Sequence, residues 1–134
     1  MNSTNNILMA TNEIIRYSDE ELKEFEAIID AKLEKARSEL DFYTNQLQNR
    51  AENADAKLKG LDDGISTAEL ERITTLASRQ RKHIQHLENA KLRINNKVYG
   101  VCRQSGKLIS KERLKAVPHA TLSIEAKQSR KIRR

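Results

Sequence analysis

Two long amphipathic segments joined by a short glycine-rich turn are the feature that most limits how this 134-residue chain can fold. In each segment, apolar residues recur every three or four positions, which is the spacing of a helix that packs along another helix. The first stripe comprises Leu22, Phe25, Ile29, Leu33, Ala36, Leu40, Tyr43, Leu47, Ala51, Ala54 and Leu58. The second comprises Leu70, Ile73, Leu76, Ile84, Leu87, Ile94 and Val98, and it is less regular around residues 79–83.

Local signals mark where the two helices begin and end. Residues 18–21 (SDEE) and 66–69 (STAE) each have the spacing of a capping box, in which a serine and a glutamate satisfy free backbone N–H groups. Two glycines and two aspartates between positions 60 and 64 form a strong turn signal. The second helix is predicted to end near Tyr99 and Gly100, because glycine favours helix termination.

Neither helix can bury its apolar stripe alone. The short and strongly specified turn favours an antiparallel hairpin over a parallel dimeric coiled coil. We therefore predict a mainly α protein built on a long antiparallel coiled-coil hairpin. Its expected parts are an N-terminal segment at 1–17, the hairpin at 18–98 with its tip at 59–66, and a small module at 99–134 that ends in a C-terminal helix.

The composition limits the compartment and the class of protein. Large apolar side chains are too few for a thick globular core, since aromatic residues are only 4% of the chain and charged residues are 33%. The single cysteine excludes an internal disulfide and fits a reducing compartment. No apolar run approaches the ~20 residues that span a bilayer, and the N-terminus lacks the features of a secretion signal. We expect a cytoplasmic monomer with no membrane contact.

Charge is divided unevenly along the chain. Residues 1–72 carry 9 Lys+Arg and 16 Asp+Glu, whereas residues 73–134 carry 16 and 3. Two explanations remain open. The two halves pair with each other, or the basic half binds an acidic protein surface, a nucleotide or a nucleic acid backbone.

The helical periodicity stops after Gly100. Residues 104–107 are predicted to form a tight turn between two short extended pieces, and residues 110–114 a brief helical turn. Thr121 or Ser123 can cap a final helix. A module this small normally needs an additional constraint, such as a disulfide or a metal ion, to stay folded. Without one, its apolar residues have to pack against the base of the hairpin. These residues are Val101, Leu108, Ile109, Leu114 and Leu122.

Residues 99–127, YGVCRQSGKLISKERLKAVPHATLSIEAK, resemble the zinc-ribbon segment of the DksA/TraR family of bacterial transcription regulators. The family pattern is aromatic-Gly-x-Cys-x-x-Cys-Gly, then Ile, Arg-Leu, Ala-x-Pro-x-Ala and a second Cys-x-x-Cys. The resemblance covers the C-terminal module well and the preceding helix reasonably. The first helix matches mainly in its coiled-coil character.

The resemblance implies four zinc-ligand positions, which here hold Cys102, Ser105, Ser123 and Ala126. Structural zinc takes four thiolate or imidazole ligands, and the nearby His119 would add one at most. We therefore expect a zinc-ribbon-like module without zinc, held by packing on the coiled coil. Cys102 is then expected to be a small buried side chain, with a redox or metal-sensing role as the alternative.

The resemblance also implies a function. Family members bind RNA polymerase and insert the hairpin tip into the secondary channel, the pore through which nucleotides reach the active site, without sequence-specific DNA binding. Their tip motif is Asp-x-x-Asp-x-Ala. Counting back from Cys102 places this motif at Lys59, Asp62 and Gly64, with Asp63 as an added acid. The residues expected nearest the polymerase active site are therefore Asp62, Asp63 and Gly64.

Some family members also bind the alarmone ppGpp through basic residues on the second helix and in the module. The matching positions are His86, Val117 and Lys127. Val117 cannot contact a phosphate, whereas Arg113 nearby could, and His83 lies one turn before His86. The implied phosphate-binding residues are therefore His83, His86, Arg113 and Lys127. The alternative is that both histidines are ordinary exposed helix residues.

Two other function classes remain open. A transcript-cleavage or anti-cleavage factor of the Gre type shares the hairpin-in-channel design and would use paired tip acids to hold a second magnesium. A nucleic-acid-binding protein would use the basic C-terminal half, but the chain lacks a helix-turn-helix and aromatic residues for stacking are scarce. The chain shows no Ser/His/Asp grouping and no phosphate-binding loop, so we do not expect an enzyme.

Overall fold

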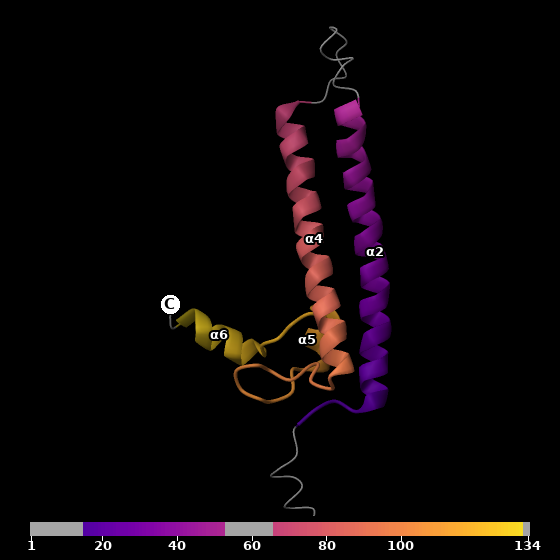
Figure 1. Cartoon of the computed structure of the whole chain (residues 1–134). Helices are drawn as coiled ribbons and strands as arrows, with labels where there is room; N and C mark the ends of the chain where they lie inside the picture. Colours follow the sequence, from indigo (N-terminus) through magenta and orange to yellow (C-terminus); the bar gives the residue numbers. More distant parts are fainter. Residues whose placement is uncertain (1–14, 53–65, 133–134) are drawn as a thin grey trace, which may run out of the picture. The chain divides into compact units, whose positions relative to one another are not determined.

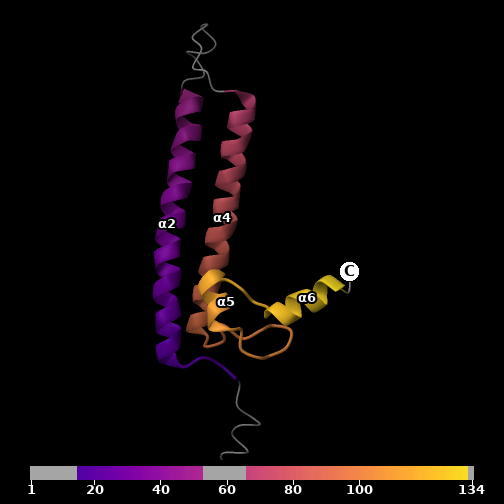
Figure 2. The same cartoon turned by 180° about the vertical axis from the view of Figure 1, so that it is seen from behind.

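The computed structural model describes residues 15–52 and 66–132. Its two long helices are α2, Asp19–Glu52, and α4, Thr67–Asn95. Between residues 27 and 89 these helices lie side by side and run in opposite directions (Figures 1 and 2). Arg37 and Glu88 form an ion pair across them at 3.0 Å. The predicted antiparallel coiled-coil hairpin is therefore confirmed.

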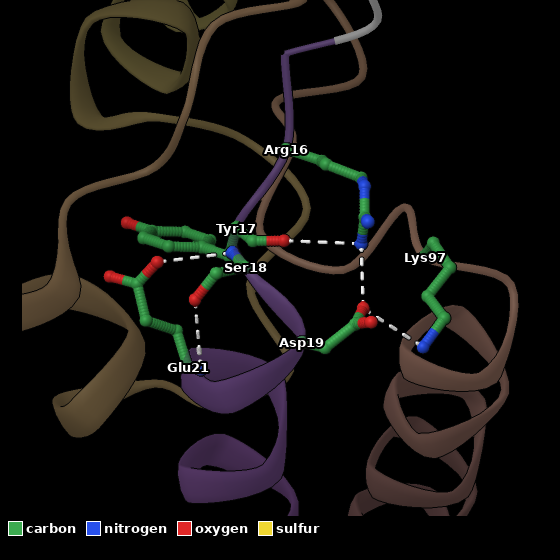
Figure 3. A network of polar contacts seen from close by, with 6 residues as sticks. All are labelled: Arg16, Tyr17, Ser18, Asp19, Glu21 and Lys97. Carbon is green, nitrogen blue, oxygen red and sulfur yellow. Dashed lines mark hydrogen bonds and ion pairs between the residues drawn. The ribbon is translucent and has the colours of Figure 1, made fainter.

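Serine caps start both long helices where the sequence predicts. The Ser18 backbone N–H donates to Glu21 Oε1 at 3.0 Å, and the Glu21 N–H donates to Ser18 Oγ at 3.2 Å. Figure 3 shows this reciprocal pair at the start of α2. In α4, the Glu69 N–H donates to Ser66 Oγ at 3.1 Å. The three acids of the first turn of α2 also lie at the positive end of the helix dipole.

The apolar stripe of α2 is buried most completely in the first half of the helix, whereas the buried residues of α4 are spread along its length. Leu40, Tyr43 and Leu47 are only half-buried. Leu70 and Val98 were predicted to belong to the second stripe, but they are 37% and 41% exposed. The stripe is completed instead by two alanines that the prediction omitted, which let the helix backbones approach closely. The buried residues of the two stripes are Leu22, Phe25, Ile29, Leu33, Ala36, Ile73, Ala77, Leu87, Ala90 and Ile94.

Gln80 explains the irregular stretch of the second stripe. It lies between Ala77 and Ile84 at three- and four-residue spacings, so the 3.6-residue period of the helix places it on the packed side. Its Nε2 donates to Glu39 Oε2 at 2.6 Å, while its buried Oε1 has no hydrogen-bond partner among the residues that the structure describes. A polar bridge between the helices therefore replaces an apolar contact at this level.

Helix α4 ends four residues earlier than predicted. Its last residue is Asn95, and Lys97 adopts the left-handed conformation with φ 64°. The Val98 N–H donates to the Arg93 carbonyl at 3.0 Å, and the Lys97 N–H donates to the Ile94 carbonyl at 3.0 Å. These two bonds define a Schellman motif, which normally places glycine where Lys97 stands.

The C-terminal module has the predicted sequence of turns and short helices. Val101 and Leu108 form an antiparallel bridge around the turn, in which Gly106 takes φ 74°. Helix α5 covers Lys111–Ala116 and is capped by Ser110, whose Oγ accepts from the Arg113 N–H at 3.2 Å. Helix α6 covers Ile124–Ile132.

The interior of the module differs in part from the prediction. Ile109 and Leu114 are buried as expected, whereas Leu108 is exposed and Val101 and Leu122 are only half-buried. The interior is completed by Tyr99, Cys102, Ala120 and Ala126.

The described chain divides into two compact units. One, which we call the module unit, contains the residues up to Glu26 together with those from Ala90 onward, and the other contains residues 27–89. The module unit thus includes the first turns of α2 and the last turn of α4. It supplies its own support for the C-terminal module.

A cluster of three aromatic rings forms the staple of the module unit. Tyr17 packs edge-on against Phe25, and Phe25 packs against Tyr99, each pair with ring centroids 5.3 Å apart. The Tyr17 hydroxyl donates to the Ile109 carbonyl, and the Tyr99 hydroxyl donates to the Pro118 carbonyl at 2.7 Å. Such rings contribute large apolar contact area in addition to favourable edge interactions. The rings therefore join the start of α2 to both halves of the module.

Candidate functional site

The four positions that the resemblance assigns to zinc ligands lie together in the module unit. Cys102 Sγ accepts the Ser105 N–H at 3.4 Å and the Ser123 N–H at 3.3 Å. Ser123 Oγ in turn accepts the Ala126 N–H at 3.1 Å, which caps α6. The backbone arrangement of a zinc ribbon is thus retained around one sulfur atom.

This donor set does not fit a structural zinc ion. One thiol, two hydroxyls and a methyl group cannot supply the four thiolate or imidazole ligands that such an ion takes. Within the described ranges, no group of three or more His, Cys, Asp and Glu side chains could hold a metal. In this chain the hydrogen bonds to Cys102 Sγ and the aromatic cluster connect the segments that a zinc ion would join.

The hydrogen bonds around Cys102 change its acidity. Burial opposes ionisation of the thiol, which is only 1% exposed. The Ser105 hydroxyl and the backbone N–H groups of Ser123, Ser105 and Gln104 favour the thiolate more strongly, so the pKa of Cys102 falls to about 6. The expectation of a small buried side chain is confirmed for its burial, but its sulfur is a hydrogen-bond acceptor rather than a purely apolar group.

This low thiol pKa predicts that stability rises with pH. The folded chain releases the Cys102 proton near pH 6, whereas an unperturbed thiol releases it near 9. Between these values the unfolded chain binds more protons, so the free energy of unfolding increases with pH. Urea denaturation at a series of pH values should show this slope in the native chain and a flatter one in Cys102→Ala. Equal slopes in both proteins would contradict the assignment.

Charged side chains surround the start of α2 in the same unit. Lys111 Nζ lies 2.6 Å from Glu21 Oε2, and this bond together with those from Ser18 lowers the pKa of Glu21 to about 2. Asp19 accepts from both Arg16 and Lys97 at 3.0 Å (Figure 3). Glu21 is partly exposed and the other members of these pairs are well exposed, so the pairs orient the segments more than they stabilise them.

The four predicted phosphate-binding residues belong to two different compact units, two residues in each. His83 and His86 lie on α4 between residues 27 and 89, and Arg113 and Lys127 lie in the module unit. Arg113 Nε donates to the Leu122 carbonyl at 2.9 Å, so part of its guanidinium already serves the module. Lys127 is exposed on α6.

His83 lines a shallow groove that sequence reasoning missed. The groove has a volume of about 170 Å³ and lies between α2 and α4. Lys32 and Lys35 contribute cations to it from α2, and Glu39 and Gln80 contribute polar groups. Their positions beside the apolar stripe of α2 could have drawn attention to the two lysines, but only the pairing of the helices brings them to His83.

The predicted tip residues Asp62, Asp63 and Gly64 lie outside the described residues. In the part of the chain that the structure describes, no helix is both long and apolar enough to cross a membrane.

Comparisons with known proteins agree with this fold and with the arrangement of the module. Residues 97–131 match the family model of the prokaryotic dksA/traR C4-type zinc finger. The RNA polymerase-binding transcription factor DksA of Caulobacter vibrioides is 31% identical over 98 residues, which cover 72% of this chain and 63% of that protein. The uncharacterized protein YteA of Bacillus subtilis is 38% identical over 64 residues, which cover 48% of this chain and 27% of YteA.

A solved structure shares the fold. The transcription factor DksA2 of Pseudomonas aeruginosa superposes with a TM-score of 0.69 at 22% sequence identity, with 84% of each chain covered. The chain thus spans 84% of that structure but less than two thirds of the Caulobacter relative, at 63%. The matched zinc-finger segment and the sequence relative support the predicted resemblance to the DksA/TraR family, and the solved structure shows the same fold.

Proposed function

We propose that this chain is a cytoplasmic, non-enzymatic transcription regulator that binds RNA polymerase. The observation that carries the proposal is the antiparallel hairpin joined to a zinc-ribbon-like module, in a chain related to a polymerase-binding factor. We further propose that the hairpin enters the secondary channel of the polymerase. Helix α2 has 34 residues, which at about 1.5 Å per residue gives roughly 51 Å of reach.

The tip would act near the polymerase active site. Asp62 and Asp63 stand in a sequence flanked by Gly60 and Gly64, which favours a turn. In this position two carboxylates could influence the catalytic magnesium or the mobile elements around it. Because only Asp62 retains an acidic position of the family motif, the direction of the effect has to be measured.

A further proposal concerns ppGpp. Bound at the junction with polymerase, it would contact His83, His86, Arg113 and Lys127, because the charges of the arginine and the lysine and the imidazole N–H groups complement its phosphates. Measuring ppGpp binding to polymerase with and without the native chain tests this. We expect the native chain to increase the binding of ppGpp to polymerase. A His86→Gln/Lys127→Gln variant that increases ppGpp binding as much as the native chain does would contradict the proposal.

Replacing the two tip aspartates tests whether the tip anchors the chain to polymerase or regulates transcription. Replacing Asp62 and Asp63 with Asn should leave the free energy of unfolding within about 0.5 kcal/mol, the usual range for exposed sites. Affinity for polymerase should fall modestly, because contacts along the helices and the module remain, whereas regulation of a sensitive promoter should fall much more. A binding titration paired with in vitro transcription measures both quantities.

The possible results distinguish the alternatives. Unchanged regulation by the double variant would remove the tip from the mechanism, and an equal loss of binding and regulation would make the tip an anchor. A transcript-cleavage assay distinguishes a cleavage factor from a regulator. Failure to compete with a known secondary-channel factor for polymerase would contradict the proposed function, and salt-dependent binding of DNA would then favour a nucleic-acid-binding protein.

A further inference from the structure

The groove between α2 and α4 has charged side chains of both signs in its walls. Its volume is about 170 Å³, which is smaller than the pockets of roughly 300–1,000 Å³ that hold drug-sized ligands. All of the lining residues belong to the compact unit of residues 27–89, so the groove does not depend on the module unit. The residues that line it are Lys32, Lys35, Ala36, Glu39, Gln80 and His83.

The two lysines of the groove have no counter-charge among the described residues. Lys32 is half-buried and Lys35 is exposed, and they lie one turn of α2 apart. Within the described ranges, neither ammonium group forms a hydrogen bond or an ion pair. Like charges one turn apart on a helix repel each other. An anion bound at both lysines would remove this repulsion.

Glu39 supplies a negative charge to the same groove. It lies one turn of α2 after Lys35, but its Oε2 accepts from Gln80 Nε2 at 2.6 Å. A carboxylate has two oxygens that accept hydrogen bonds, so Glu39 Oε1 remains for another donor. From Lys32 to Glu39 the groove therefore presents two cations and then an anion, over roughly 10 Å at 1.5 Å per residue.

We propose that this groove binds a small zwitterion with a net negative charge, of which a dicarboxylic amino acid is the simplest example. Such a molecule carries two carboxylates and one ammonium group, the reverse of the charges that line the groove. Its carboxylates pair with Lys32 and Lys35, and its ammonium group pairs with Glu39. Glu39 repels a simple dianion, and a neutral ligand leaves both lysines unpaired.

This amino-acid site is separate from the proposed polymerase function. The groove shares only His83 with the residues implied for ppGpp, and binding there requires neither polymerase nor the hairpin tip. A negative result at the groove would therefore leave the proposed polymerase function unchanged.

Titration of the full-length chain with L-glutamate tests the proposal, with potassium chloride used to hold the ionic strength constant. The ring resonances of His83, which lines the groove, should shift and saturate, whereas those of His119 in the module unit should not. Glutarate has the same two carboxylates without the ammonium group. It should bind about threefold more weakly or less tightly still, because it lacks the pair with Glu39.

Two double variants separate the groove from general attraction. Lys32→Gln/Lys35→Gln should weaken glutamate binding by about tenfold or more, because it removes two charge-assisted contacts. Arg81→Gln/Lys82→Gln removes the same charge from two exposed residues of α4 that do not line the groove. This control should change the affinity by less than about twofold, since exposed charges outside the site are screened by salt.

A variant of Glu39 tests the choice of a zwitterion. Glu39→Gln keeps an acceptor for Gln80 but removes the negative charge, so glutamate and glutarate should then bind equally. The melting temperature of each variant reports any damage to the hairpin.

Four results would overturn the proposal. Equal losses in the two double variants would show general electrostatic attraction. Glutarate binding as tightly as glutamate to the native chain would exclude a pair with Glu39. Loss of binding in His86→Gln/Lys127→Gln, with none in Lys32→Gln/Lys35→Gln, would place the ligand at the other residues. No saturable shift of His83 at any glutamate concentration would show that the groove does not bind this class of ligand.

Discussion

Replacing Leu87 with Asp should lower the free energy of unfolding by about 4 kcal/mol or more, with a matching loss of helicity. The Leu87 side chain is 0% exposed in the seam between the long helices. The substitution removes its apolar contacts and places an unpaired carboxylate among apolar side chains. Urea denaturation followed by circular dichroism measures the change.

Two further aspartate substitutions make this result interpretable. Leu92 lies on the same helix but is 58% exposed, so Leu92→Asp should change stability by less than about 0.5 kcal/mol. Leu40 is only half-buried, and Leu40→Asp should fall between the other two. Equal effects at Leu87 and Leu92 would show that the seam is assigned wrongly.

Replacing Gly100 with Ala should destabilise the module more than the same change at Gly106. A Cβ at Gly100 would lie 2.7 Å from Cδ2 and Cε2 of Tyr17 and 3.1 Å from Cδ1 of Leu114. At Gly106 a Cβ would meet no atom within 4 Å. Both glycines have positive φ, +79° and +74°, so both variants carry a conformational cost of about 1–2 kcal/mol.

The difference between the two glycine variants isolates the close packing of the Tyr17 ring. Steric overlap with a buried ring typically adds about 1–3 kcal/mol, so Gly100→Ala should lower stability by that much more than Gly106→Ala. A double-mutant cycle with Tyr17→Ala measures the coupling, since removing the ring makes room for the methyl group. Additive effects would mean that the ring does not press on Gly100.

Comparing Tyr17→Ala with Cys102→Ala tests which contacts hold the module together. The family model that matches residues 97–131 is that of a four-cysteine zinc finger, yet only Cys102 remains of the four ligand positions. If the aromatic cluster is the main staple, Tyr17→Ala alone should expose the module to proteolysis. If Cys102→Ala has the larger effect, the hydrogen-bonded sulfur carries more of the connection.

Features that depend on near neighbours in the sequence could be predicted from the sequence alone. The serine caps of α2 and α4 need only a partner three residues away, and the apolar repeat needs only the period of a helix. The hairpin, its direction and the order of turns in the module follow from these signals. The end of α4 did not follow, because Lys97 occupies a left-handed position that local propensity assigns to glycine.

Tertiary structure decided which side chains of different segments meet. Gln80 could not be placed in the seam from sequence, because its bond to Glu39 exists only once the helices pair. Tyr17 precedes the first helix without any periodic signal, yet its hydroxyl bonds to Ile109, 92 residues away. The sequence by itself determined the helices and their caps, because these depend on residues a few positions apart. It also determined that three of the four zinc-ligand positions hold side chains that do not bind zinc. The acidity of Cys102 depends on groups brought together by the fold, because hydrogen bonds and charges act through space rather than along the chain.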